Sequence, residues 1–182
     1  MRSAFLAPLL LAAAPAFASG LEIRVAGEAN GVIRIDLFED VAPLHVEQIT
    51  TLASEGAYDG VVFHRVIEGF MAQTGDVEFG RIGQDLSMAG RGGSALDDLP
   101  AEFSGLPYER GTVGMARSQS PNSANSQFFI MFAPAPHLNG GYTVVGEVTE
   151  GMEIVDAIKR GAGSNGSVIG RPDVMETVTV TE

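Results

Sequence analysis

The chain has 182 residues, a formal net charge of −12 and no cysteine, and 45% of its residues are hydrophobic. A protein this acidic repels phosphate backbones and anionic lipid surfaces, so we expect neither nucleic acid nor a membrane surface as its partner. Without cysteine the fold has no disulfide bonds, so its hydrophobic core must stabilise it.

The N-terminal segment has the composition of a secretory signal peptide. Arg2 supplies a positive charge, the residues from Ala4 to Ala14 are mostly apolar, and Ala16-Phe17-Ala18 fits a small-residue cleavage site. The apolar run is shorter than the about 20 residues that cross a bilayer. We therefore expect a signal peptide over residues 1–18, cleaved after Ala18. We also expect a periplasmic protein with one domain over residues 19–182.

Two strands and a tight turn are predicted at the start of this domain. Residues 21–25 and 33–37 alternate between apolar and polar side chains, as half-buried strands do. The Asn30-Gly31 pair between them is a strong signal for a β-hairpin turn.

A helix is predicted next, beginning near Pro43 and ending at Gly56. Proline suits the first helical position, glycine suits the end, and apolar residues recur at helical spacing between them, namely Val46, Ile49, Leu52 and Ala53. We expect His45, on this helix, to be exposed.

The remainder is predicted to be mainly strands, with one long loop and a second helix. Strand patterns occur at residues 61–67, 70–74, 112–116, 128–132, 142–148 and 177–181. The Gly- and Asp-rich stretch 77–110 has little periodicity and is expected to be a long loop. Met152, Val155 and Ile158 share one face of a second helix that ends before Gly161. Many short strands with two helices indicate a mainly β fold, a closed antiparallel barrel that the helices cap.

The segment 63–73 places one arginine and one glutamine among large apolar residues. On alternating strands two groups of side chains share a face, namely Phe63, Arg65 and Ile67, and then Met71 and Gln73. An arginine on an apolar surface is costly unless it has a partner, and we expect that partner to be a ligand. Together with the apolar segment 126–132, this predicts a hydrophobic pocket with a few hydrogen-bond donors.

These segments resemble the cyclophilin-type peptidyl-prolyl cis-trans isomerases, in particular the small exported bacterial members. The resemblance extends from about Leu21 to Glu182 and is strongest in FHRVIEGFMAQTGD (63–76), GTVGMARSQSPNSANSQFFIMF (111–132) and LNGGYTVVGEVTEGMEIVDAI (138–158). It implies a barrel of eight antiparallel strands with a helix at each end, an active groove on the outer face, and no cofactor.

The resemblance also implies which residues form the site. Arg65 matches the family's catalytic arginine, and the proline pocket matches Phe70, Met71, Phe129 and Leu138. The other matches are polar groove residues at Gln73 and Gln127, peptide-holding backbone groups at Ala116 and Arg117, and groove-lining residues at Ile67 and Tyr142. His137 stands where many members have a tryptophan at the border of the groove. His64 is expected to be a hydrogen-bonded structural histidine.

The activity implied is the acceleration of X–Pro bond rotation in proline-containing peptides and unfolded exported proteins, with Arg65 stabilising the twisted amide. The protein is expected to act as a monomer. A proline-peptide binding module or holdase with low turnover is the alternative. A secreted serine hydrolase is a distant third, because the serines of residues 118–126 lack a nucleophile-elbow pattern. Three histidines without paired spacing predict no metal site.

Overall fold

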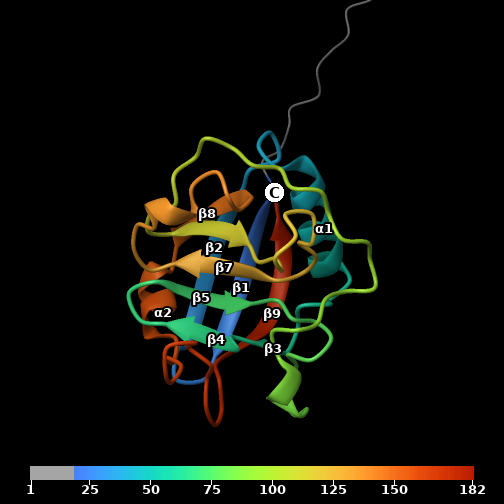
Figure 1. The fold of residues 1–182 in the computed structure, drawn as a ribbon. Helices are drawn as coiled ribbons and strands as arrows, with labels where there is room; N and C mark the ends of the chain where they lie inside the picture. Colours follow the sequence, from blue (N-terminus) through green and yellow to red (C-terminus); the bar gives the residue numbers. More distant parts are fainter. Residues whose placement is uncertain (1–18) are drawn as a thin grey trace, which may run out of the picture.

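The computed structural model describes residues 19–182, so the predicted signal peptide over residues 1–18 lies outside it. Within that range one antiparallel sheet of nine strands carries the fold, together with two α-helices and two short 3₁₀ helices (Figure 1). The strands are β1 (Gly20–Ala26), β2 (Gly31–Leu37), β3 (Val61–Val62), β4 (Arg65–Ile67), β5 (Met71–Thr74), β6 (Thr112–Met115), β7 (Phe128–Met131), β8 (Val144–Glu150) and β9 (Val174–Thr181). The helices are α1 (Pro43–Ser54), α2 (Met152–Ala157), η1 (Leu86–Met88) and η2 (Pro136–Leu138).

Several predicted elements are confirmed. Strands β1 and β2 form an antiparallel hairpin, and α1 has Pro43 in its first turn. The stretch 77–110 is irregular apart from η1 and isolated bridges. Helix α2 is shorter than predicted, since it ends at Ala157. No helix in residues 19–182 combines the length and apolar character needed to span a bilayer.

The predicted closed barrel of eight strands is wrong. The sheet has nine strands in the order β3-β9-β1-β2-β8-β6-β7-β5-β4, and no ladder joins its two edge strands. Loops satisfy these edges instead: the Val62 amide donates to Gly80 O, and the Val66 amide donates to Gly166 O. Phe63 and His64, between β3 and β4, are outside any strand. The sheet therefore curls into an open half-barrel whose edges are covered by loops.

The two faces of β5 and β7 serve different cores because side chains alternate along a strand. Ala72, Phe128 and Ile130 point into the main core, which also contains residues of β1, β2, α1 and β9. Met71 and Phe129 point the other way, into a smaller apolar cluster on the outer face. This smaller cluster forms the base of the site described below.

The prediction that Phe63, Arg65 and Ile67 share one face is wrong. Phe63 is fully buried in the main core with Val66, whereas Ile67 packs on the outer cluster. Phe63 therefore does not share a face with Arg65 and Ile67. The reason is the break at residues 63–64, where the chain leaves the strand and the alternation of faces is interrupted.

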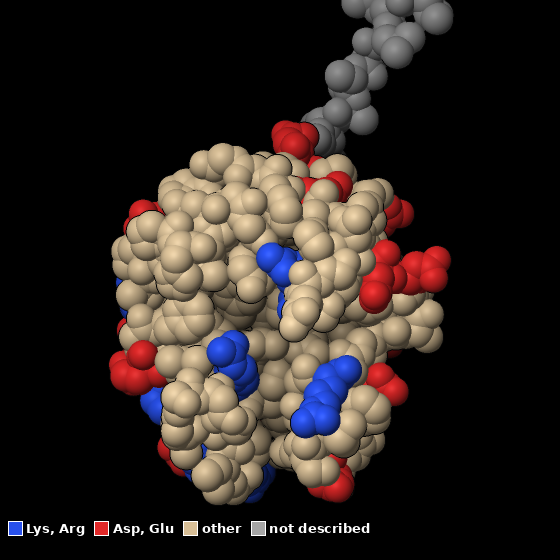
Figure 2. All heavy atoms as spheres, viewed as in Figure 1, with Lys and Arg blue, Asp and Glu red and all other residues tan. Residues whose placement is uncertain are grey.

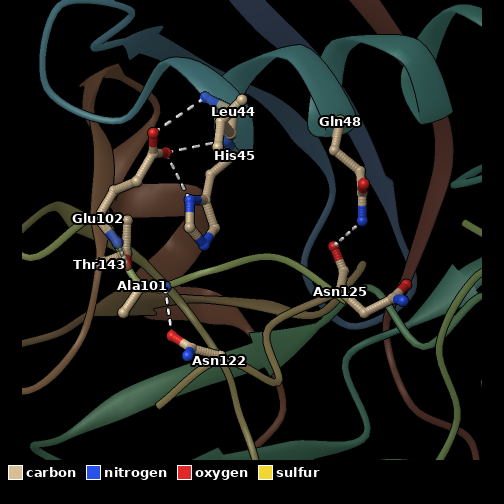
Figure 3. Close-up of polar contacts among 8 residues, drawn as sticks. All are labelled: Leu44, His45, Gln48, Ala101, Glu102, Asn122, Asn125 and Thr143. Carbon is tan, nitrogen blue, oxygen red and sulfur yellow. Dashed lines mark hydrogen bonds and ion pairs between the residues drawn. The ribbon is translucent and has the colours of Figure 1, made fainter. Parts of the chain in front are cut away.

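The prediction that His45 is exposed is also wrong. His45 is fully buried, and its Nδ1 lies 2.7 Å from a carboxylate oxygen of Glu102 (Figure 3). The same carboxylate accepts hydrogen bonds from the amides of Leu44 and His45, in the first turn of α1. Ala42, the residue before the helix, offers no capping side chain. Glu102 from the long loop therefore caps α1, which attaches this loop to the helix.

The Glu102 contacts lead to a prediction about stability. Glu102→Ala should lower the free energy of unfolding by about 2 kcal/mol, because α1 loses its cap and the buried His45 ring loses its partner. Urea unfolding followed by circular dichroism measures the change. The exposed Glu176 on β9 provides the control Glu176→Ala, which should leave stability nearly unchanged. Equal stabilities of the two variants would contradict the capping role.

Candidate functional site

The strand register places the predicted site residues in rows across the outer face of the sheet. Arg65 of β4 pairs with Gln73 of β5, Gln73 pairs with Phe129 of β7, and Phe129 pairs with Gly114 of β6. One row therefore runs from a cation through an amide to an aromatic ring and a glycine. Segments far apart in sequence meet here because β5 lies between β4 and β7 (Figure 1).

A pocket of about 170 Å³ opens on this face. Nine of the predicted site residues line it, namely Arg65, Phe70, Met71, Gln73, Ala116, Arg117, Phe129, Leu138 and Tyr142. Gln127 lines a neighbouring pocket instead. Ile67 packs on the outer cluster, and His137 is exposed with its ring centroid 5.6 Å from that of Phe70; neither of them lines the two pockets.

Phe129 lies in this pocket because Gly114, its neighbour on β6, has no side chain. A Cβ at Gly114 would lie 2.7 Å from the Phe129 ring and 2.4 Å from the Tyr108 hydroxyl oxygen. Tyr108 stacks on Phe129 with ring centroids 5.7 Å apart, and it is almost fully buried. Burial raises the pKa of Tyr108 above its ordinary value. Sequence reasoning missed Tyr108, since it ends a loop without periodicity.

The Arg65 guanidinium is held by neutral acceptors. Its Nε donates to the Asn165 carbonyl at 2.9 Å, and its Nη1 donates to Gln73 Oε1 at 3.1 Å. None of the carboxylates in the described range forms an ion pair with it. Burial lowers the pKa of Arg65, although arginine remains protonated at neutral pH. The guanidinium has five N–H donors, so three make no hydrogen bond to the described chain beside the pocket that Arg65 lines.

A chain of side-chain amides connects Arg65 to the neighbouring loop. Gln73 accepts from Arg65 and donates through Nε2 to Gln127 Oε1 at 2.9 Å. Gln127 in turn donates through Nε2 to the Gly92 carbonyl at 2.8 Å. Each amide thus accepts on one side and donates on the other, which fixes the orientation of both glutamines.

Asp76 fixes the loop that contains Gly90 and Gly92. Its carboxylate is fully buried and accepts hydrogen bonds from the amides of Glu78, Phe79, Gly90 and Gly92. Four backbone donors satisfy a buried charge without a cationic partner. Nothing in the sequence pattern indicated this role, because its partners lie up to sixteen positions away on a loop without periodicity.

The loop and the segment 116–127 enclose a second, larger pocket of about 480 Å³. Gln73, Ala116 and Arg117 line both pockets and form the ridge between them. Figure 2 shows this face hollowed, with basic atoms around the hollow. On the ridge, within the described chain, neither the Ala116 carbonyl nor the Arg117 amide hydrogen-bonds to another protein group. These two groups are available to an extended peptide.

His64 lies beneath this site. It is 8% exposed, and within the described part of the chain neither ring nitrogen has a hydrogen-bond partner of good geometry, although the Val62 backbone and the Gln127 side chain lie nearby. Burial lowers its pKa to about 4, which keeps the ring neutral at pH 7. His64 is therefore a buried neutral ring, and the hydrogen bonds expected for it are not made.

The site combines an apolar pocket, a cation and a row of oriented amides. In residues 19–182 no three His, Asp or Glu side chains lie together in an arrangement that would hold a metal ion. The apolar pocket is suited to binding a small apolar ring. The cation and the amides beside it can donate hydrogen bonds to a neighbouring ligand group that becomes a better acceptor during a reaction.

Comparison with known proteins identifies a family model and relatives that match this chain. Residues 21–180 match the family model described as cyclophilin-type peptidyl-prolyl cis-trans isomerase. The chain is 58% identical over 153 residues to a probable peptidyl-prolyl cis-trans isomerase of Brucella suis, covering 83% of this chain and 78% of the relative. It is 37% identical over 166 residues to peptidyl-prolyl cis-trans isomerase B of Escherichia coli K12, covering 84% and 96%.

Solved structures give the same result. A cyclophilin-type peptidyl-prolyl cis-trans isomerase of Cryptosporidium parvum is similar with a TM-score of 0.77 and 25% identity, covering 91% of this chain and 99% of that one. Its structure in the presence of the dipeptide Ala-Pro is similar with a TM-score of 0.75 and 26% identity, covering 90% and 99%.

The buried neutral His64 predicts a pH-dependent loss of stability. The unfolded chain binds a proton at His64 below its ordinary pKa of about 6.5, whereas the folded protein does so only below about 4. Stability therefore falls as pH decreases through this window, by about 3 kcal/mol from this residue. Urea unfolding of the wild type and His64→Gln between pH 7 and pH 4 measures it. Parallel pH profiles for the two proteins would contradict this prediction.

Proposed function

This chain belongs to the family of cyclophilin-type peptidyl-prolyl cis-trans isomerases, and we propose that the 170 Å³ pocket beside Arg65 is its active site. In this proposal the pocket takes the proline ring of a peptide, and Arg65 stabilises the twisted X–Pro amide. The single observation that supports it most is a guanidinium that lines an apolar pocket and has no carboxylate partner in the described chain.

The reaction has to overcome amide resonance. An X–Pro bond rotates through a barrier of about 18–20 kcal/mol, and uncatalysed exchange takes about tens to hundreds of seconds. Turnover at about a hundred per second would require about four decades of acceleration, equivalent to about 5 kcal/mol. Groups that bind the twisted amide better than either planar isomer supply such a difference.

Arg65 is suited to that role because of what happens at the prolyl nitrogen. When the amide twists, this nitrogen loses conjugation, becomes pyramidal and regains a lone pair. A guanidinium N–H aimed at the nitrogen gains a hydrogen bond that neither planar isomer offers. The Asn165 carbonyl and Gln73 hold the guanidinium in place beforehand, so little orientation is lost during rotation.

The apolar pocket would hold the proline ring still while the acyl side rotates. Met71, Phe129 and Leu138 are each less than a tenth exposed and pack in the outer cluster, so the walls are rigid. The similar cyclophilin solved in the presence of Ala-Pro supports proline-containing peptides as the ligand class. An apolar wall also favours the twisted amide, which has less charge separation than the planar forms.

The flanking peptide would bind along the ridge between the two pockets. The Ala116 carbonyl and the Arg117 amide are free to pair with an extended peptide backbone, as an added strand would. The Gln73 side chain, held by Arg65 and Gln127, lies beside them. These groups would hold the residues before proline while the prolyl bond turns.

We further propose that the protein is exported as a monomer and acts on unfolded exported proteins. The support for export is the signal-like composition of residues 1–18 and the position of the domain after them. Expression of the full chain followed by mass spectrometry of the periplasmic fraction tests it, with a mature chain that begins at Ser19 as the expected result. An unprocessed chain in the cytoplasm would contradict it.

The decisive experiment measures isomerisation of a short X–Pro peptide in a protease-coupled assay or by NMR exchange. Arg65→Ala should lower kcat/KM by about a hundredfold or more, because the transition state loses a preorganised donor. Arg65→Lys should retain part of the activity, since it keeps the charge and loses the planar fork.

The matched control is Arg24→Ala, at an exposed arginine of β1 that lines neither pocket. It should leave turnover unchanged, and circular dichroism should show that every variant is folded. Undiminished turnover in Arg65→Ala would refute the role of Arg65. Peptide binding by the wild type without acceleration would instead identify a proline-peptide binding module or holdase.

A further inference from the structure

We propose that this groove selects peptides with an acidic side chain within the three residues before proline, because unpaired arginines border its two pockets. The inference rests on the proposed function and deepens it by naming a substrate class. Its specificity-determining residues are Arg117 and Arg91.

The charge around the groove is opposite to that of the chain. Among residues 19–182, three arginines line the two pockets, namely Arg65, Arg91 and Arg117, and Asp98 is the one carboxylate that lines them, in a protein with a net charge of −12. Figure 2 shows basic atoms around the hollow of this face and acidic atoms toward its margins. A cleft of one charge in a protein of the other concentrates ligands of matching charge.

The arginines outside the groove are of two kinds, since Arg24, Arg81 and Arg171 form no ion pair with the described residues, whereas the other three do. Arg34, Arg110 and Arg160 each form an ion pair with a carboxylate. By contrast, no side chain in residues 19–182 forms an ion pair with an arginine of the groove. Their charges are therefore free to interact with a ligand.

Arg117 is fixed in position without being neutralised. Its guanidinium donates to the Gly141 carbonyl at 2.8 and 3.2 Å and to the Ser118 carbonyl at 2.9 Å. It also stacks on the Tyr142 ring, 4.4 Å from the centroid. Neutral acceptors and an aromatic face hold the cation in place but leave its charge intact, so binding an anion costs little side-chain entropy.

Arg91 and the larger pocket provide the space for an acidic side chain. Gly90, Gly92 and Gly93 line this pocket of about 480 Å³, so side chains of the loop do not fill it. Arg91 is exposed at its edge, and its guanidinium forms no ion pair with the described chain. The carboxylate of Asp98 accepts from the neutral Asn125 Nδ2 at 3.1 Å and keeps its charge, but the three arginines that line the two pockets outnumber it.

The position of the acidic residue in the peptide follows from the order of the two pockets along the groove. The proposed ring pocket lies on one side of the ridge formed by Gln73, Ala116 and Arg117, and the larger pocket lies on the other. In the proposed mechanism the ridge holds the acyl side of the prolyl bond. An extended peptide advances about 3.3 Å per residue, so the residues before proline would reach the larger pocket.

The test uses peptides that carry a single Glu, Gln or Lys at the first, second or third position before proline. At low salt the best Glu peptide should exceed its Gln counterpart in kcat/KM by about fivefold, which is the scale of an exposed ion pair. The Lys peptide should be poorer than the Gln peptide. The Glu preference should nearly disappear at about 1 M salt, where the screening length is about 3 Å.

The kcat/KM for the Glu peptide, divided by that for the Gln peptide, is then measured for each variant. Arg91→Gln and Arg117→Gln should each lower this ratio, and Arg117→Lys should retain more of it than Arg117→Gln. Arg24→Gln removes one exposed positive charge outside the groove and should leave both the ratio and the activity unchanged. Because the Arg91 side chain makes no hydrogen bond to residues 19–182, its variant remains informative even if the Arg117 variants fail to fold.

The outcomes separate this inference from the proposed function. No acceleration with any peptide would overturn the proposed function. Acceleration without a preference for Glu would overturn the present inference and leave the proposed function intact. A preference for Glu that survives in the Arg91→Gln and Arg117→Gln double variant would overturn the assignment of these two residues.

Discussion

The site depends on Arg65, a half-buried cation that lines the pocket and whose hydrogen-bond partners are both neutral. A guanidinium beside an apolar pocket would ordinarily require a carboxylate, and such a pair would direct its N–H groups away from any ligand. Here the Asn165 carbonyl and Gln73 orient Arg65 and leave its charge uncompensated. The arrangement is stable enough to persist and remains available for a transition state that exposes a lone pair.

The same principle recurs around the groove. Arg117 is held by carbonyl oxygens and an aromatic ring, and the two glutamines are held by each other and by Gly92. Asp76, the buried anion behind the loop, is satisfied by backbone amides alone. Fixed neutral dipoles thus orient each charged group, which preorganises the site. They also allow a positive groove to exist in a strongly acidic protein.

Strand alternation links this site to the stability of the fold. Phe128 and Ile130 pack into the main core while Phe129, between them, forms part of the pocket. A shift of one residue in the register of β7 would exchange these faces and destroy both the core and the pocket. The core thereby fixes the position of the site, and loops from three parts of the chain complete it: residues 90–98, 116–127 and 161–167.

The sequence alone determined most of the strands, the approximate places of the two helices and the shared face of Met71 and Gln73, because hydrophobic periodicity is a local property. Its family motifs also indicated the residues that line the pocket. The tertiary structure alone decided that the sheet remains open, that Phe63 turns inward, and that His45 is buried against Glu102. Each of these depends on a partner distant in sequence, such as the Gly166 loop on the edge of β4 or the loop that caps α1. Periodicity carries no information about such partners, so only the folded chain could reveal them.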